Sequence, residues 1–187
     1  MRPVVFFDRD GTLNVERGYL RRVDDLELIP QAPEAIRRIH SAGWAAVLVT
    51  NQSGAARGYF SLAHIDALND RLVGLLAAQG AALHGVYTCP HLPHSEGGVT
   101  SPLAIDCACR KPLPGMAVRA AVELDLDLGL SVVIGDKAAD IGLARAIGAR
   151  AVLVRTGFGL ETLRAGHAPD LVADDVGDAV QQVLALR

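Results

Sequence analysis

The chain has 187 residues, of which half are hydrophobic and 21% are charged, and its formal net charge is −3. This composition fits one compact domain over residues 1–187 and gives no electrostatic reason to bind nucleic acid or an anionic membrane. No apolar run approaches the roughly 18 residues that span a bilayer, and the early Asp8 excludes a secretory signal. We therefore expect a cytoplasmic monomer without nucleic-acid or membrane partners.

Apolar runs and helical periodicities alternate along the chain. In chain order they predict a strand at 3–8, a helix at 33–41, a strand at 44–50, a helix at 61–79, a strand at 86–89, a helix at 115–124, a strand at 132–135, a helix at 141–147, strands at 151–154 and near 171, and a helix at 176–186. Alternating strands and helices favour a Rossmann-like three-layer α/β/α fold with a parallel sheet. Ligands of such sheets bind beyond the carboxyl ends of the strands, where we expect Asp8, Thr50, Cys89 and Asp136 to converge.

The first strand runs into two aspartates, Asp8 and Asp10, within the stretch VVFFDRDGTLN. Like charges this close repel, and a carboxylate at the edge of a core is costly to desolvate, so a cation is expected there. An EF-hand loop would need ligands where this chain has Thr12 and Tyr19, and glycine where it has Leu13. That alternative fails, and a simple turn or helix cap does not explain why Asp8 ends a buried strand.

Four stretches resemble, in order, the motifs of the haloacid dehalogenase superfamily: DRDGTLN at 8–14, TNQSG at 50–54, CRKP at 109–112 and GDKAAD at 135–140. Walker-type and GxGxxG phosphate-binding motifs are absent from the sequence. The resemblance implies the fold of that superfamily. The two positions at which its members insert a cap hold only short segments here, so no large cap domain is expected.

The resemblance also implies a Mg²⁺-dependent phosphatase. Asp8 would attack phosphorus to form an aspartyl-phosphate, and Asp10 would protonate the leaving group and later activate water. Thr50 would hold phosphate oxygens, and Lys111 would stabilise negative charge. Magnesium is expected on the Asp8 carboxylate, the Asp10 backbone carbonyl and Asp136. A phosphatase-like module without activity is the alternative, and it is disfavoured because all of these residues are present.

Two short pairs, C-P-H and C-A-C, border a loop insertion at 89–109. Three thiolates and one imidazole are typical of structural Zn²⁺, for which we expect the ligands Cys89, His91, Cys107 and Cys109. An odd number of cysteines without a signal peptide argues against disulfides. His94 is the alternative to His91. Zinc would fix the backbone before Arg110 and Lys111 without touching phosphate.

Within the superfamily, the zinc loop and CRKP resemble two groups of enzymes. One removes the C7 phosphate of D-glycero-D-manno-heptose 1,7-bisphosphate for lipopolysaccharide precursors, and the other hydrolyses histidinol phosphate. NVERGYL and TNQSGAARG favour the heptose group and leave the anomer open. The expected contacts to this small phosphorylated sugar are Glu16, Arg17, Gly18, Tyr19, Asn51, Gln52, Ser53, Arg110 and Lys137.

For some charged residues in these stretches the sequence predicts a specific role, and for others it predicts only exposure to solvent. Arg110 would grip the second phosphate, because a guanidinium can donate two parallel hydrogen bonds to it. Arg17 and Arg57 read by default as solvated charges, although Arg17 lies within the expected sugar-binding stretch. Asp140 has two open readings, either a partner of Lys111 or of a metal-bound water, or a solvated acid at a helix start.

Overall fold

The structure is a computed structural model, and it describes residues 1–96, 98 and 100–186. Residues 97 and 99 belong to the predicted loop insertion 89–109, and residue 187 ends the predicted domain. These three residues lie outside the described part of the chain.

A parallel sheet forms the centre of the molecule. In the described residues it has six strands, in the order β3-β2-β1-β4-β5-β6. Their bounds are β1 (Arg2–Phe7), β2 (Ala45–Asn51), β3 (Gly85–Cys89), β4 (Leu126–Gly135), β5 (Arg150–Val154) and β6 (Leu171–Ala173). Phe7 pairs with Leu48 of β2 on one side and with Ile134 of β4 on the other. The strand order therefore reverses at β1, which is where parallel sheets bind ligands.

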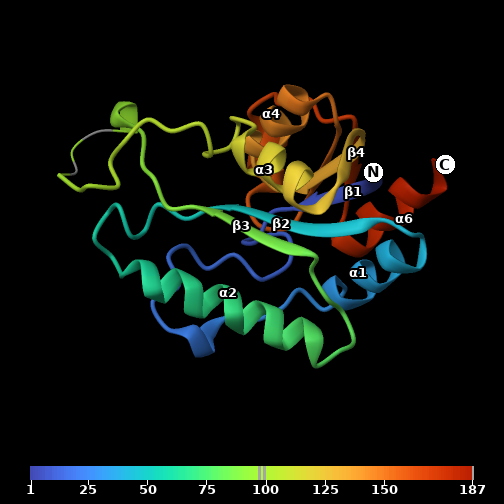
Figure 1. The fold of residues 1–187 in the computed structure, drawn as a ribbon, viewed down its shortest axis with the longest axis horizontal. Coiled ribbons are helices and arrows are strands. Elements are labelled where there is room, and N and C mark those ends of the chain that lie inside the picture. The colour runs from blue at the N-terminus through green and yellow to red at the C-terminus, as the bar shows by residue number, and fades with distance from the viewer. Residues whose placement is uncertain (97, 99, 187) are drawn as a thin grey trace.

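Helices cover both faces of the sheet, which confirms the predicted α/β fold class (Figure 1). One face carries α1 (Ala32–Ser41), α2 (Leu62–Ala77) and α6 (Val176–Ala185), and the other carries α3 (Gly115–Leu124) and α4 (Ala138–Ile147). Val5 and Phe7 of β1 pack into the core on the first face, whereas Val4 and Phe6 pack into the core on the second. Burial on both faces explains why the β1 sequence is apolar without alternation.

Local signals set several element ends. The Ser61 hydroxyl accepts a hydrogen bond from the His64 N–H at 3.2 Å, as expected of the residue that caps α2. α4 begins at Ala138, three residues before its prediction, because the Asp140 carboxylate accepts from the Lys137 N–H at 3.0 Å and closes the first turn. α5 (Gly159–Arg164) was not predicted, since six residues are too few to show a helical period.

β4 differs most from its prediction, because it starts at Leu126 and not at residue 132. Its first half carries Asp127, Gly129 and an exposed Leu130, so it lacks a continuous apolar run. Pairing of Arg2 with Leu126 nevertheless extends the ladder.

The connections that follow β1 and β3 contain little regular structure. Between β1 and α1 the described residues contain the 3₁₀ turn η1 (Val23–Asp25), and between β3 and α3 they contain η2 (His94–Glu96). The second connection projects beyond the sheet in Figure 1. In the part of the chain that the structure covers, no helix is both long and apolar enough to cross a bilayer.

Candidate active site

A buried lysine joins two carboxylates at the reversal point of the sheet. The Lys111 ammonium donates to Asp8 at 2.8 Å, to Asp140 at 2.6 Å and to the Val49 carbonyl at 2.9 Å. Asp8 follows β1, Asp140 lies in the first turn of α4, and Lys111 precedes α3. Asp140 is 2% exposed, so the reading of Asp140 as a solvated acid is wrong and its reading as a partner of Lys111 is confirmed.

Asp136 directly follows β4 and is fully buried. Its Oδ2 accepts from the Phe158 N–H at 2.8 Å, while its Oδ1 has no hydrogen-bond partner and lies 3.7 Å from the Lys137 ammonium. Oxygen atoms of Asp8, Asp136 and Asp140 all lie within 4.8 Å of one another. An unpartnered carboxylate oxygen beside two further carboxylates fits a hard divalent cation such as Mg²⁺.

Two glycines make room for Asp136. A Cβ atom on Gly11 would lie 2.3 Å from the Asp136 Oδ2, and one on Gly157 would lie 2.2 Å from it. Gly11 also has a φ of +83°, in the region that other residues rarely adopt. The glycine of DRDG is therefore required both by its backbone and by its closeness to the carboxylate.

Burial and neighbouring charges shift the pKa values of Asp8 and Asp136 in opposite directions. Burial raises the pKa of Asp8, but the charges of Lys111 and Lys137 outweigh burial and leave that pKa below its usual value. Burial, together with the charge of Asp8, raises the pKa of Asp136 to about 8, although Lys137 opposes this. Without a cation, Asp8 is therefore ionised, while Asp136 keeps a proton near neutral pH. A bound cation would replace that proton.

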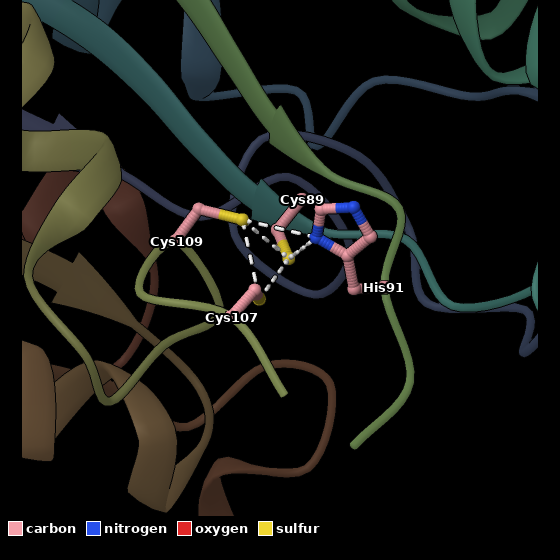
Figure 2. Close-up of side chains that lie close together, drawn as sticks. All are labelled: Cys89, His91, Cys107 and Cys109. Atoms are coloured by element: carbon pink, nitrogen blue, oxygen red, sulfur yellow. Dashed lines mark hydrogen bonds between the residues drawn. The ribbon is translucent and has the colours of Figure 1, made fainter. Parts of the chain in front are cut away.

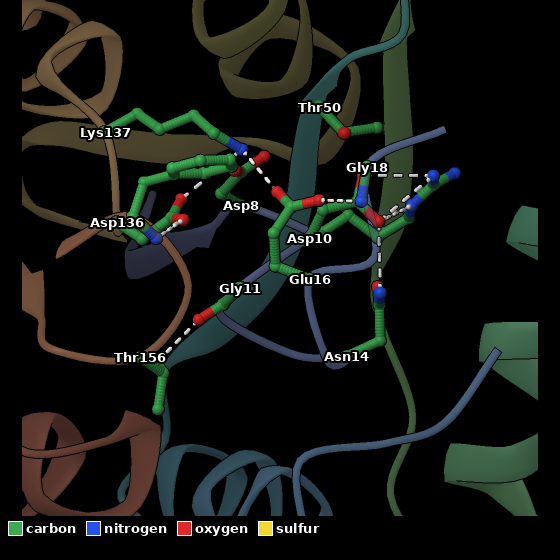
Figure 3. A network of polar contacts seen from close by, with 12 residues as sticks. Asp8, Asp10, Gly11, Asn14, Glu16, Gly18, Thr50, Asp136, Lys137 and Thr156 are labelled. Atoms are coloured by element: carbon green, nitrogen blue, oxygen red, sulfur yellow. Dashed lines mark hydrogen bonds and ion pairs between the residues drawn. The ribbon is translucent and has the colours of Figure 1, made fainter. Parts of the chain in front are cut away.

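Asp10 is held by a separate set of donors (Figure 3). Its carboxylate accepts from Asn14 at 3.0 Å, from Arg9 at 3.0 Å and from Gln52 at 2.8 Å. The Gln52 amide also donates to the Thr50 hydroxyl at 2.9 Å, so it links two predicted catalytic residues. Arg9, only 2% exposed, was missed by sequence reasoning. Its position between two aspartates in a buried motif was the available signal.

A cavity of about 930 Å³ opens beside these groups. Its lining includes most of the predicted site residues: Asp10, Glu16, Gly18, Tyr19, Asn51, Gln52, Ser53, Arg110, Lys111 and Lys137. Arg17 does not join them, because its guanidinium pairs with the exposed Glu27 at 2.7 Å and lines a different cavity of about 790 Å³. The structure therefore brings together the predicted substrate-binding set except for Arg17.

Some of the lining residues are already engaged within the protein. Glu16 accepts from the Lys137 ammonium at 2.9 Å and from the Gly18 N–H at 2.7 Å, which ties the loop after β1 to the start of α4. The Asn51 amide exchanges two 3.0 Å hydrogen bonds with the backbone of Lys111. Glu16 and Asn51 thus shape the cavity by holding its walls.

The three cysteines and His91 gather at the base of the projecting connection (Figure 2). Their sulfur and Nδ1 atoms lie 3.1–3.7 Å apart, with Cys89 buried at the end of β3. Tetrahedral zinc with bonds of about 2.0–2.3 Å would separate its ligand atoms by about 3.5–3.8 Å, so the donor set fits this ion. The Arg110 guanidinium donates to the His91 carbonyl at 3.2 Å, which connects the cluster to the cavity wall.

Comparison with known proteins agrees with this geometry. A family model described as HAD-hydrolase-like matches residues 108–179. D-glycero-D-manno-heptose-1,7-bisphosphate 7-phosphatase from Thermosynechococcus vestitus is 51% identical, over 97% of this chain and 95% of the relative. D-glycero-beta-D-manno-heptose-1,7-bisphosphate 7-phosphatase from Yersinia pestis is 41% identical, over 98% and 96%.

A solved structure is similar over the whole length. It is D,D-heptose 1,7-bisphosphate phosphatase from B. bronchiseptica complexed with magnesium and phosphate, with a TM-score of 0.85, 35% sequence identity and full coverage of both chains. Because relatives above 30% identity match nearly the whole chain, this chain belongs to the haloacid dehalogenase superfamily, in its family of heptose-bisphosphate phosphatases.

Proposed function

We propose that this chain hydrolyses the C7 phosphate of D-glycero-D-manno-heptose 1,7-bisphosphate with Mg²⁺ as cofactor. The observation that carries the proposal is Asp8 hydrogen-bonded to buried Lys111, with a carboxylate oxygen within 4.8 Å of one from Asp136, whose Oδ1 has no partner. The names of the full-length relatives support the heptose substrate over histidinol phosphate.

Each side chain takes a role that its contacts support. The Asp8 carboxylate attacks phosphorus and becomes an aspartyl-phosphate, while the Lys111 ammonium balances charge on the attacking and phosphoryl oxygens. Asp10 gives a proton to the leaving alkoxide and then takes one from the attacking water. Hydrogen bonds from Asn14, Arg9 and Gln52 fix the position of the Asp10 carboxyl group.

The phosphate is bound by groups on the surrounding walls. Thr50 and the backbone N–H groups that follow it bind phosphate oxygens. The cavity residues around Tyr19 and Ser53 contact the sugar, and Arg110 and Lys137 recognise its negative charge.

Mg²⁺ would be held by the carboxylates of Asp8 and Asp136 and by the backbone carbonyl of Asp10. When bound, it neutralises the charge that develops on the phosphoryl oxygens. Asp140 stays with Lys111 and fixes the position of its ammonium. The magnesium in the B. bronchiseptica structure supports this choice of ion.

We also propose a structural Zn²⁺ on Cys89, His91, Cys107 and Cys109. The ion would order the loop insertion and so place Arg110 and Lys111, without taking part in the reaction. We further propose that residues 1–187 form one domain. The protein would be a cytoplasmic monomer that acts on a small phosphorylated sugar.

Phosphate release tests the proposal. Purified protein with Mg²⁺ is given both anomers of heptose 1,7-bisphosphate and, separately, histidinol phosphate, with Asp8→Asn as the control for contaminating phosphatases. We expect a strong preference for a heptose bisphosphate that disappears in the variant. A preference for histidinol phosphate would overturn the substrate while leaving the mechanism in place.

A further inference from the structure

A carboxylate of the projecting loop lies between two arginines at the cavity. Glu96, in η2, accepts from Arg110 at 3.1 Å through Oε1 and from Arg57 at 2.8 Å through Oε2. Glu96 and Arg110 both line the 930 Å³ cavity. Arg57 follows the TNQSG segment, so three separate stretches of sequence meet at this anion.

The two arginines are less exposed than the carboxylate that joins them. Their side chains are 24% and 19% exposed for Arg57 and Arg110, against 40% for Glu96. Arg110 is also held by the His91 carbonyl at 3.2 Å. The Nε of Arg57 is buried and has no hydrogen-bond partner, so this guanidinium keeps an unused donor. Two such cations side by side attract an anion with several oxygens.

Glu96 supplies only two oxygens to these donors, whereas a phosphate monoester offers three. A glutamate in a short 3₁₀ turn of a loop can also rotate away about its side-chain bonds. A phosphate that binds Arg110 must therefore compete with Glu96 for the same N–H groups.

We infer that Glu96 is a specificity-determining residue that occupies the second-phosphate position of the free enzyme and is displaced by substrate. This inference rests on the proposed function, since it assigns the non-reacting phosphate to Arg110 and adds Arg57 to that position. A substrate with one phosphate, bound at Asp8, leaves the Glu96 ion pairs intact. A bisphosphate must break both pairs, so Glu96 weakens binding of bisphosphates alone.

Steady-state kinetics of Glu96→Gln test the inference, because glutamine keeps the shape and removes the charge. We expect KM for the heptose bisphosphate to fall about three- to tenfold, as two partly exposed ion pairs no longer compete. The kcat for this substrate and the KM for p-nitrophenyl phosphate, which has one phosphate, stay unchanged. Glu34→Gln, which removes a surface ion pair with Arg37 on α1, is the matched control.

A rise in KM for the bisphosphate would overturn the inference, because Glu96 would then be a support for the arginines. Equal changes for both substrates, or no change, would overturn it too. If the wild-type protein hydrolyses neither substrate, the proposed function fails. Calorimetric titration with inorganic phosphate then tests whether an anion displaces Glu96. Tighter or additional phosphate binding in Glu96→Gln supports displacement, and superimposable titrations contradict it.

Discussion

The two clusters of candidate metal ligands are built in opposite ways. The carboxylate cluster of Asp8, Asp136 and Asp140 lies at strand ends and a helix start and is buried, and Lys111 joins Asp8 to Asp140. The thiol cluster joins the end of β3 to residues of a loop with little regular structure, and Cys107 and Cys109 remain partly exposed. The sheet therefore positions the carboxylate cluster, whereas the thiol cluster itself positions the loop that carries it.

This difference predicts different consequences of losing a metal. The carboxylate cluster is held by the sheet and by lysines, so removal of Mg²⁺ abolishes the chemistry and leaves the geometry. Burial raises the pKa of the Cys89 thiol, so a thiolate at Cys89 needs a metal to persist. Removal of Zn²⁺ is therefore expected to disorder the loop before it affects the sheet.

The largest expected effect is that of Asp8→Asn. Loss of the nucleophile lowers kcat by about four orders of magnitude or more, since the remaining groups only bind and orient. The fold is retained because asparagine keeps a hydrogen-bond acceptor for Lys111. Initial rates and thermal unfolding, measured in parallel, check both statements. A loss below about tenfold would show that another group attacks phosphorus.

Lys111→Met breaks the centre of the carboxylate cluster. Asp8 and Asp140 then stay buried without their counter-charge, which destabilises the fold by about 3–5 kcal/mol. Urea unfolding at neutral pH measures the difference. Lys137→Met is the comparison and should cost less, because the Lys137 side chain is 38% exposed. Equal destabilisation by the two variants would contradict the central position given to Lys111.

The pH dependence of stability in Asp136→Asn tests whether a cation replaces a proton on Asp136. The pKa of Asp136 is raised from 3.8 to about 8 in the folded protein. Between these values the folded state holds a proton that the unfolded state has lost, so this contribution to stability is complete below about pH 4 and disappears as pH rises through about 8.

With chelator present, Asp136→Asn should therefore gain in Tm relative to wild type between pH 5 and pH 8. Mg²⁺ should stabilise only the wild-type protein, because it replaces the proton that the carboxylate otherwise keeps. Thermal unfolding at both pH values, with and without Mg²⁺, makes the comparison. A difference in Tm that is independent of pH would refute the protonated Asp136.

Cys107→Ser addresses the thiol cluster and should have the smallest effect of the four. We expect loss of bound zinc and a KM for the bisphosphate that rises about tenfold, because Arg110 is no longer fixed. His94→Ala, in the same loop, should keep zinc and KM, since the clustered imidazole is that of His91. Elemental analysis with kinetics tests both. If His94→Ala lost zinc, His94 and not His91 would be the zinc ligand.

The sequence predicted best those features for which a residue pattern has one structural explanation. Non-alternating apolar runs gave the central strands, and the motif residues Asp8, Lys111 and Asp136 do meet at the rim. The burial of Arg9 and Asp140 needed tertiary structure, because charged residues are solvated by default. The ion pair of Arg17 with Glu27 depends on where an irregular loop turns, which no periodicity encodes.

The proposed mechanism depends on formation of an aspartyl-phosphate at Asp8. Rapid mixing with heptose 1,7-bisphosphate and Mg²⁺, acid quenching and peptide mass spectrometry would detect it directly. We predict one transient phosphoryl group on the peptide that contains Asp8, absent from Asp8→Asn and without Mg²⁺. A phosphoryl group on another residue, or turnover with no phosphorylated enzyme at any time, would contradict the mechanism.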